Sequence, residues 1–161
     1  MRKDILSMLE RDGKLTAEEI AVLLNLPAGE VRAEIDAMER EQVICGYGAF
    51  INWEKTGSEY LTALIEVRVT PSRGEGFNRI AERIARFDEV KAVYLMSGGY
   101  DLAVILLAKT LKDIAFFVSD KLSPLESVLS TATHFVLKKY KDHGVFFGEE
   151  EGGDERMIVS P

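Results

Sequence analysis

The stretch EYLTALIEVRVT, residues 59–70, decides the fold of this 161-residue chain. Its apolar residues alternate with polar ones: Ala63, Ile65, Val67 and Val69 against Thr62, Glu66 and Arg68. Alternation of period two is typical of a strand that buries one face and exposes the other. The stretch therefore predicts an amphipathic strand in a chain whose flanking segments have helical period.

Downstream of this strand, the pattern changes between helical and strand period several times. Residues 76–87 have helical spacing, residues 90–96 and 101–108 are strand-like and separated by SGGY, and a second helix is indicated from Leu111 to Leu122. Residues 128–140 close the series with a strand. The order βαββαβ predicts a ferredoxin-like domain, an antiparallel sheet with two helices on one face. The tail that follows is acidic and rich in glycine, which favours a flexible segment.

Upstream, three short helices are predicted, from about residue 2 to 11, 16 to 24 and 28 to 41. TAEE, residues 16–19, is the pattern of a capping box that starts the second helix, whose inward face is predicted as Ile20, Leu23 and Leu24. Pro27 disfavours helical conformation in the residue before it, so it separates the second helix from the third. Two helices joined by a tight turn and braced by a first one indicate a helix-turn-helix. The fold class is therefore α+β.

Composition excludes several classes of protein. One cysteine, Cys45, allows no disulfide within the chain and fits a reducing, cytoplasmic location; a buried core position is expected for it. Cys45, His134 and His143 are too few and too far apart for zinc, and no cofactor is implied. No apolar run reaches the length of a membrane span, and Asp4 and Glu10 argue against a signal peptide. No catalytic constellation is visible, so an enzyme is not expected.

The net charge of −7 is unevenly distributed. Residues 1–47 carry −4, residues 48–148 carry +1 and residues 149–161 carry −4. Nucleic acids select for cations, so an acidic N-terminal third is unusual for a DNA-binding module.

The stretch VICGYGAFIN, residues 43–52, links the two modules and is predicted to be a strand in which Gly46 and Gly48 bracket Tyr47. A helix-turn-helix, then a glycine-bracketed strand, then a βαββαβ domain resembles the Lrp/AsnC family of transcriptional regulators. The SGGYD turn, residues 97–101, and the closing strand TATHFVL, residues 131–137, are also similar to the family's motifs. The resemblance covers roughly residues 3 to 143.

The resemblance implies a regulator that binds double-stranded DNA, forms a homodimer or higher oligomer, and senses an amino acid or related metabolite. The linking strand would pair across the dimer. The implied domains are residues 1–44 for DNA binding, 45–58 for the hinge strand and linker, 59–143 for effector sensing and oligomerisation, and 144–161 for the acidic flexible tail. The residues expected to face DNA are Lys14, Thr16, Ala28, Gly29, Arg32, Ala33, Asp36 and Arg40.

The third helix departs from the family pattern. Glu34 stands where the family usually has arginine, and it is expected to repel phosphate together with Glu30 and Asp36. DNA binding is therefore expected to be modest. Two alternatives stay open: a metabolite sensor that does not bind DNA, and a subunit of a haem-pathway decarboxylase of the siroheme type, whose members are similar in architecture.

For the effector, the expected site is the SGGYD turn with hydroxyls from the last strand. Glycine lets backbone amides approach a ligand, and Asp101 can accept from an ammonium group. An equally good interpretation is a tight hairpin turn in which Asp101 satisfies backbone amides, with the threonines as ordinary strand residues. The residues concerned are Ser97, Gly98, Gly99, Tyr100, Asp101, Thr131 and Thr133.

Overall fold

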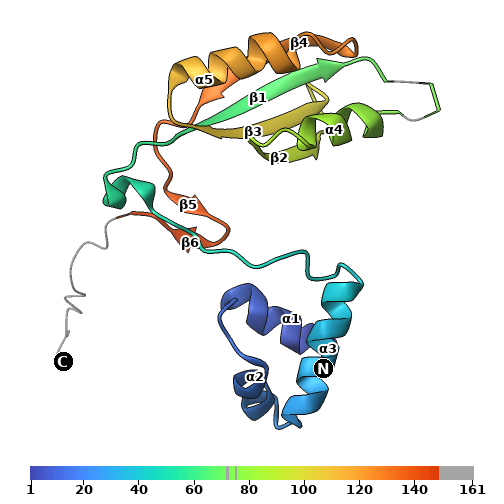
Figure 1. Ribbon diagram of the computed structural model, residues 1–161, viewed down its shortest axis with the longest axis vertical. Coiled ribbons are helices and arrows are strands. Elements are labelled where there is room, and N and C mark those ends of the chain that lie inside the picture. The colour runs from blue at the N-terminus through green and yellow to red at the C-terminus, as the bar shows by residue number, and fades with distance from the viewer. Residues whose placement is uncertain (72, 75, 149–161) are drawn as a thin grey trace, which may run out of the picture. The chain divides into compact units, whose positions relative to one another are not determined.

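The structure, a computed structural model, describes residues 1–71, 73–74 and 76–148, and the chain divides into two compact units. The first unit, residues 1–51, contains three helices, and the second, from residue 52 onward, contains the sheet (Figure 1). The elements are α1 (Arg2–Arg11), α2 (Ala17–Leu24), α3 (Ala28–Arg40), η1 (Trp53–Thr56), β1 (Leu61–Val69), α4 (Asn78–Ala85), β2 (Val90–Leu95), β3 (Leu102–Ala108), α5 (Leu111–Phe116), η2 (Phe117–Leu122), β4 (Val128–Phe135), β5 (Lys141–Asp142) and β6 (Val145–Phe146).

The three helices of the first unit enclose a small apolar core. Ile5 of α1, Ile20 of α2 and Met38 of α3 have no exposed surface. The prediction that Leu23 faces inward is wrong, since Leu23 is 62% exposed and the smaller Ala21 is buried instead. The buried stripe of α2 follows the helical spacing i, i+1, i+4, which leaves position 23 to one side.

The turn between α2 and α3 is set by local sequence. The predicted capping box is confirmed: the Thr16 hydroxyl accepts from the Glu19 amide at 3.2 Å, and the Glu19 carboxylate accepts from the Thr16 amide at 2.8 Å. Asn25 ends α2 in the left-handed region, with φ 55° and ψ 49°. Asparagine tolerates this conformation better than most residues. Pro27 then precedes the first turn of α3, which completes the predicted helix-turn-helix.

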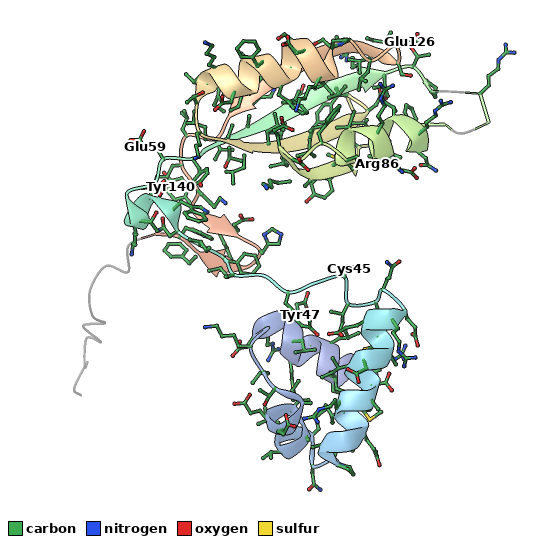
Figure 2. All side chains as sticks on the ribbon, in the orientation of Figure 1. Cys45, Tyr47, Glu59, Arg86, Glu126 and Tyr140 are labelled. Carbon is green, nitrogen blue, oxygen red and sulfur yellow. The ribbon has the colours of Figure 1, made fainter. Side chains whose placement is uncertain are left out.

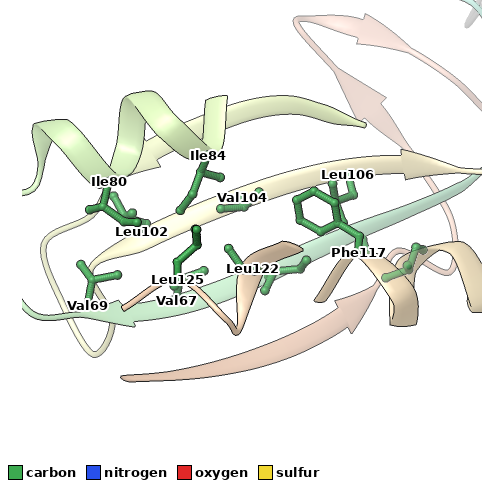
Figure 3. Packing of buried hydrophobic residues seen from close by; sticks show 13 residues of the cluster. Val67, Val69, Ile80, Ile84, Leu102, Val104, Leu106, Phe117, Leu122 and Leu125 are labelled. Carbon is green, nitrogen blue, oxygen red and sulfur yellow. The ribbon is translucent and has the colours of Figure 1, made fainter. Parts of the chain in front are cut away.

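The second unit is the predicted βαββαβ domain. Its four long strands form an antiparallel sheet in the order β2-β3-β1-β4. Val67 of β1 and Val104 and Leu106 of β3 face the helices and pack with Ile84 of α4 and Leu122 of η2 (Figure 3). The alternation that predicted β1 is thus confirmed, because its inward residues are buried.

The other face of the sheet carries both apolar and polar residues. Leu64 lies opposite Ile105, and Tyr94 lies opposite Ala103. Tyr94 is 53% exposed in the single chain. His134 lies on this face as well, with its Nε2 atom 3.4 Å from the carboxylate of Glu66. This face is therefore apolar at its centre and in part open to solvent.

The linking stretch, residues 43–52, forms no strand within the single chain. A strand is defined by a ladder of hydrogen bonds to a neighbouring strand, and the neighbour expected for this segment is a second copy of the chain, so the pairing across a dimer stays a prediction. Cys45 is exposed, which corrects the expectation of a core position (Figure 2). The Tyr47 hydroxyl donates to the Glu39 carboxylate at 2.8 Å, so a hydrogen bond connects the linking stretch to α3.

Two features near the C-terminus were not apparent from periodicity. The predicted single helix of residues 111–122 divides into α5 and a π-helical turn, η2, where the Ser123 amide donates to the Val118 carbonyl at 2.8 Å. A small hairpin, β5–β6, crosses the predicted boundary between residues 143 and 144. Of the predicted acidic tail, residues 149–161 lie outside the described residues.

Candidate DNA interface and effector site

The predicted DNA-facing residues of α3 share one exposed face. Gly29, Ala33, Asp36 and Arg40 are exposed, and Arg32 is exposed beside them. Their spacing of three and four residues places them along one side of the helix. Ala28, in the first turn, is half-buried. Helical projection therefore predicted correctly which residues of α3 are exposed.

Glu34 does not belong to this surface, which corrects the expectation that it repels phosphate. Its side chain is only 20% exposed and forms an ion pair with Arg2 of α1. Glu41, seven residues further and immediately after the end of α3, accepts from the same guanidinium at 2.7 Å. The hydrogen bond from Arg2 holds the pKa of Glu41 below its ordinary value. The two acids thus bind α1 to α3 on the side away from the exposed face.

The cations available for phosphate are few. Arg32 forms an ion pair with Glu18 of α2. The Arg40 guanidinium donates to the carbonyl of Asp36 at 3.2 Å. Within the described part of the chain, neither Arg40 nor Lys14 forms an ion pair, so both charges are available to a polyanion.

The Thr16 hydroxyl is less available than predicted. It donates to the Glu19 carboxylate at 2.9 Å and accepts from the Glu19 amide, so its single proton is already used. Hydrogen bonds from the amide and hydroxyl of Thr16 lower the pKa of Glu19, which keeps this carboxylate charged beside the helix start. A phosphate oxygen, which needs a donor, would have to displace this contact.

The SGGYD turn connects β2 to β3 as predicted. The Met96 amide donates to the Asp101 carbonyl at 2.8 Å, which closes the hairpin. Gly98 has φ 155°, a backbone conformation that residues with side chains rarely adopt, and a Cβ atom there would meet nothing within 4 Å. The turn therefore leaves open space above its backbone, as an approach by a ligand would require.

Asp101 anchors the turn to β1. Its Oδ2 atom accepts from the Val69 amide at 2.8 Å, and its own amide donates to the Val67 carbonyl at 3.0 Å. The register between β1 and β4 shifts between Arg68 and Val69, so the aspartate satisfies an amide at an irregular point of the sheet. This contact supports the structural interpretation of Asp101 and leaves its Oδ1 atom to accept from a ligand.

The two halves of the predicted effector site lie on different sides of β1. Thr131 is paired with Val67 and Thr133 with Ile65, both on the edge strand β4 and both half-buried. The turn, in contrast, leads into β3 on the other side of β1. Two strand spacings, roughly 10 Å, therefore separate the threonines from the start of β3. Tyr100 is half-buried at the turn, and Ser97 and Gly99 are exposed.

Sequence reasoning missed the contacts that Arg2 makes with Glu34 and Glu41. The sequence did contain a signal for these contacts. Glu34 and Glu41 are seven residues apart, which places them on the same side of the helix, and α1 carries a cation, Arg2, that can reach both. The same ambiguity between an exposed and a packed carboxylate applies to any short helix in a small domain.

The described residues contain neither a metal-binding cluster nor a membrane-spanning helix. No group of three His, Cys, Asp or Glu side chains is placed to hold a metal ion. No helix in the described ranges is both long and apolar enough to cross a membrane.

Comparison with known proteins assigns a family to each unit. Residues 1–44 match the winged helix-turn-helix DNA-binding family, and residues 62–146 match the Lrp/AsnC ligand binding domain. The HTH-type transcriptional regulator YugG of Bacillus subtilis is 51% identical over 159 residues, which covers 98% of this chain and 95% of the relative.

Solved structures agree on the fold. The leucine response regulatory protein LrpA of Mycobacterium tuberculosis superimposes with a TM-score of 0.74 at 19% identity, covering 91% of this chain and 97% of that one. A transcriptional regulator of Neisseria meningitidis, solved as an L-Met complex, has a TM-score of 0.69 at 22% identity and covers 88% and 90% of the two chains. The helix-turn-helix, the βαββαβ domain and these matches lead to one conclusion: the chain belongs to the Lrp/AsnC family of DNA-binding transcriptional regulators.

Proposed function

We propose that this regulator binds double-stranded DNA through the exposed face of α3 and adjusts that binding to an amino acid sensed by its second unit. The observation that carries the proposal is the exposed face of Gly29, Ala33, Asp36 and Arg40 on the second helix of a helix-turn-helix. In such motifs the N-terminal residues of this helix approach base edges in the major groove. Small residues at positions 29 and 33 permit a close approach.

Affinity is expected to depend on a small number of phosphate contacts. Lys14 and Arg40 carry unpaired charge in the described residues, while Arg32 must leave Glu18 to reach a phosphate. Each neutralised phosphate releases condensed counterions, so the slope of log K against log salt counts these contacts. We expect a shallow slope for one chain and twice that slope for a dimer.

The experiment is a salt series of fluorescence anisotropy on the DNA upstream of the protein's own gene. Arg40→Ala should weaken binding and reduce the slope by about one per chain. Arg86→Ala removes an exposed arginine at the end of α4 in the second unit and is the matched control. If the parent fails to bind at low salt, the function is that of a metabolite sensor without DNA binding.

For the sensed molecule, we propose an amino acid at the SGGYD turn. Support comes from the open space over Gly98 and from the Oδ1 atom of Asp101, which makes no hydrogen bond among the described residues. An α-ammonium group can donate to that oxygen, and exposed turn amides suit the carboxylate. The solved relative from Neisseria meningitidis holds L-Met, which makes amino acids the first ligands to screen.

We also propose a homodimer or a larger assembly, formed in part by the second face of the sheet. Leu64, Tyr94 and Ile105 lie on that face, where apolar surface is left open in the single chain. Contiguous exposed apolar surface is typical of a contact with another protein. The linking stretch, residues 43–52, would gain a ladder partner in such an assembly.

A further inference from the structure

The short hairpin of β5 and β6, which follows β4 in the second unit, is a local concentration of positive charge (Figure 1). Lysine stands at three of the four positions 138–141. Residues 48–148 as a whole hold 13 Lys and Arg against 12 Asp and Glu, a balance of +1. Residues 138–147 alone hold three lysines against one acid, a balance of +2. The rest of that range is therefore slightly acidic, and the hairpin forms a separate positive patch.

The backbone of this hairpin is well defined. β5 and β6 pair with each other, and the Phe147 amide donates to the Tyr140 carbonyl at 2.9 Å. The two turn residues, His143 and Gly144, have φ of 47° and 80°. Positive φ at both positions is the geometry of a type I′ turn, whose twist matches that of two antiparallel strands. The hairpin can therefore present its side chains at fixed positions.

Two of the three lysines are available to an external anion. Lys139 is half-buried and forms an ion pair with Asp142 at 2.8 Å, so the one acid of the hairpin is already used. Lys138 and Lys141, the hairpin lysines, are exposed, and neither forms an ion pair among the described residues. The Lys138 ammonium lies 5.0 Å from the centre of the Tyr140 ring. The hairpin therefore presents two positive charges with no carboxylate partner.

Exposed aromatic rings lie among these lysines. Tyr140 and Phe146 are each 64% exposed, and Tyr140 projects beside the hairpin in Figure 2. Phe146 is paired with Lys141 across the two strands, so ring and ammonium share one face. Lysines for phosphate, with rings that can pack against sugar or base, are the combination found on nucleic-acid-binding surfaces.

The hairpin is also close, along the chain, to the DNA-binding unit. The side-chain nitrogen of Asn52 lies 3.5 Å from the Phe147 carbonyl oxygen, and Asn52 directly follows the first unit, which ends at Ile51. Asn52 is twelve residues after Arg40, the last residue of α3. A chain of that length spans at most about 43 Å, and one turn of duplex measures about 34–36 Å. The linking stretch thus keeps the hairpin within reach of a duplex held by α3, whatever the arrangement of the two units.

We propose that this hairpin binds the phosphate backbone of the same duplex that α3 contacts. Lys138 and Lys141 donate to phosphate oxygens, and Tyr140 packs against the sugar-phosphate chain. Such contacts position a protein on DNA without reading sequence. They supply cations that the first unit lacks, where Arg40 and Lys14 carry the charges of the DNA-facing set that have no ion pair among the described residues. The inference rests on the proposed function and adds a second contact surface to it.

The test is a salt series of fluorescence anisotropy on the full chain, with the DNA upstream of its own gene and a scrambled duplex of equal length. Lys138→Ala/Lys141→Ala should weaken binding on the order of tenfold or more at 100 mM salt. The loss should be the same factor for both duplexes, and the slope of log K against log salt should fall by about two per chain. Equal slopes in this variant and the parent would overturn the proposal.

The matched control removes two other lysines from the same unit. Lys109 and Lys112 are exposed on either side of the start of α5, and the Lys112 ammonium also lies over a ring, 5.6 Å from the centre of Phe116. Lys109→Ala/Lys112→Ala therefore changes the net charge by the same amount and should leave the slope unchanged. An equal loss in this control would reduce the effect to net charge and would overturn the assignment to the hairpin.

The acidic segment that follows the hairpin is the rival partner for its lysines. Residues 149–161 carry five acids and one arginine and lie outside the described residues. The lysine substitutions are therefore repeated together with Glu149→Gln/Glu150→Gln/Glu151→Gln. The proposal expects them to reduce the slope in both backgrounds. A loss seen only together with the glutamine substitutions would assign the lysines to the acidic segment in the parent and would overturn the proposal.

Arg40→Ala separates a failure of this inference from a failure of the proposed function. If Arg40→Ala weakens DNA binding and the hairpin variant does not, α3 contacts DNA and the hairpin does not. If the parent binds neither duplex at low salt, both proposals fall. Thermal unfolding of each variant verifies that it is folded, which is expected because the lysines are exposed and the hairpin backbone is unchanged.

Discussion

Arg2 connects the start of α1 to the acidic side of α3, so a change at Glu34 acts on folding before it acts on DNA. Glu34→Arg places a second guanidinium against Arg2, whose ion pairs with Glu34 and Glu41 are then opposed by like charge. We expect a lower melting temperature and no gain in DNA affinity at equal salt. Exchanging the charges in Arg2→Glu/Glu34→Arg should recover part of the lost stability. Tighter DNA binding by Glu34→Arg alone would mean that position 34 faces DNA.

Asp101 combines a structural contact with a proposed ligand contact, and two substitutions separate them. Asp101→Ala leaves the Val69 amide without its acceptor and should cost about 1–3 kcal/mol of stability. Asp101→Asn can still accept from that amide through its carbonyl oxygen, so it should unfold close to the parent. If the turn holds an amino acid, Asn also removes the counter-charge and should reduce the thermal shift given by that ligand. Equal ligand-induced shifts in Asp101→Asn and the parent would leave the aspartate with a structural role alone.

At the scale of the element, α2 depends on its capping box. Thr16→Ala removes the hydroxyl that accepts from the Glu19 amide and should cost about 1 kcal/mol. The folded state lowers the pKa of Glu19 from its ordinary 4.5, so the contribution of this carboxylate is present above that value and is lost as pH falls through the folded pKa. The difference between parent and Thr16→Ala should therefore shrink in acid. Urea unfolding of both proteins at neutral and at acidic pH measures it, and a constant difference would exclude the carboxylate from the effect.

The elements that sequence predicted well are those whose pattern has a local cause. The alternation of apolar residues from Ala63 to Val69 indicates a strand with one buried face, and the pair Thr16 and Glu19 indicates the start of a helix. Both elements were therefore predicted from the sequence. The remainder depends on non-local contacts. Residues 43–52 have the composition of a strand, which forms only where a second strand offers a hydrogen-bond ladder, and the π turn at Phe117–Leu122 preserves the apolar spacing that suggested a regular helix. Of the candidate site, the exposed face of α3 was predictable, whereas the ion pairs of Arg2 and Arg32 required the packing of three helices.

At the scale of the whole molecule, the net negative charge of the first unit and the open apolar sheet face of the second unit both bear on assembly. The first unit is acidic, so its DNA contact rests on few cations, and a second copy would double them without any new residue. The second unit leaves Tyr94 and its neighbours open on one face of the sheet. Association of two chains through that face would cover the apolar surface. It would also bring two α3 helices, and twice the number of cations, to one DNA.

Tyr94→Arg tests this association directly. An arginine on the edge strand β2 of a paired sheet face would bury charge without a partner, which strongly opposes assembly. Light scattering of the parent at micromolar concentration should give at least twice the 18.0 kDa mass of one chain. Tyr94→Arg should shift that mass toward the single chain. Leu111→Arg is the control, since Leu111 is similarly exposed, 57% against 53%, but begins α5 on the helical layer. A parent that is monomeric, or a Tyr94→Arg variant that keeps the parent's mass, would remove the sheet face from the interface and leave the linking stretch as the surface to examine.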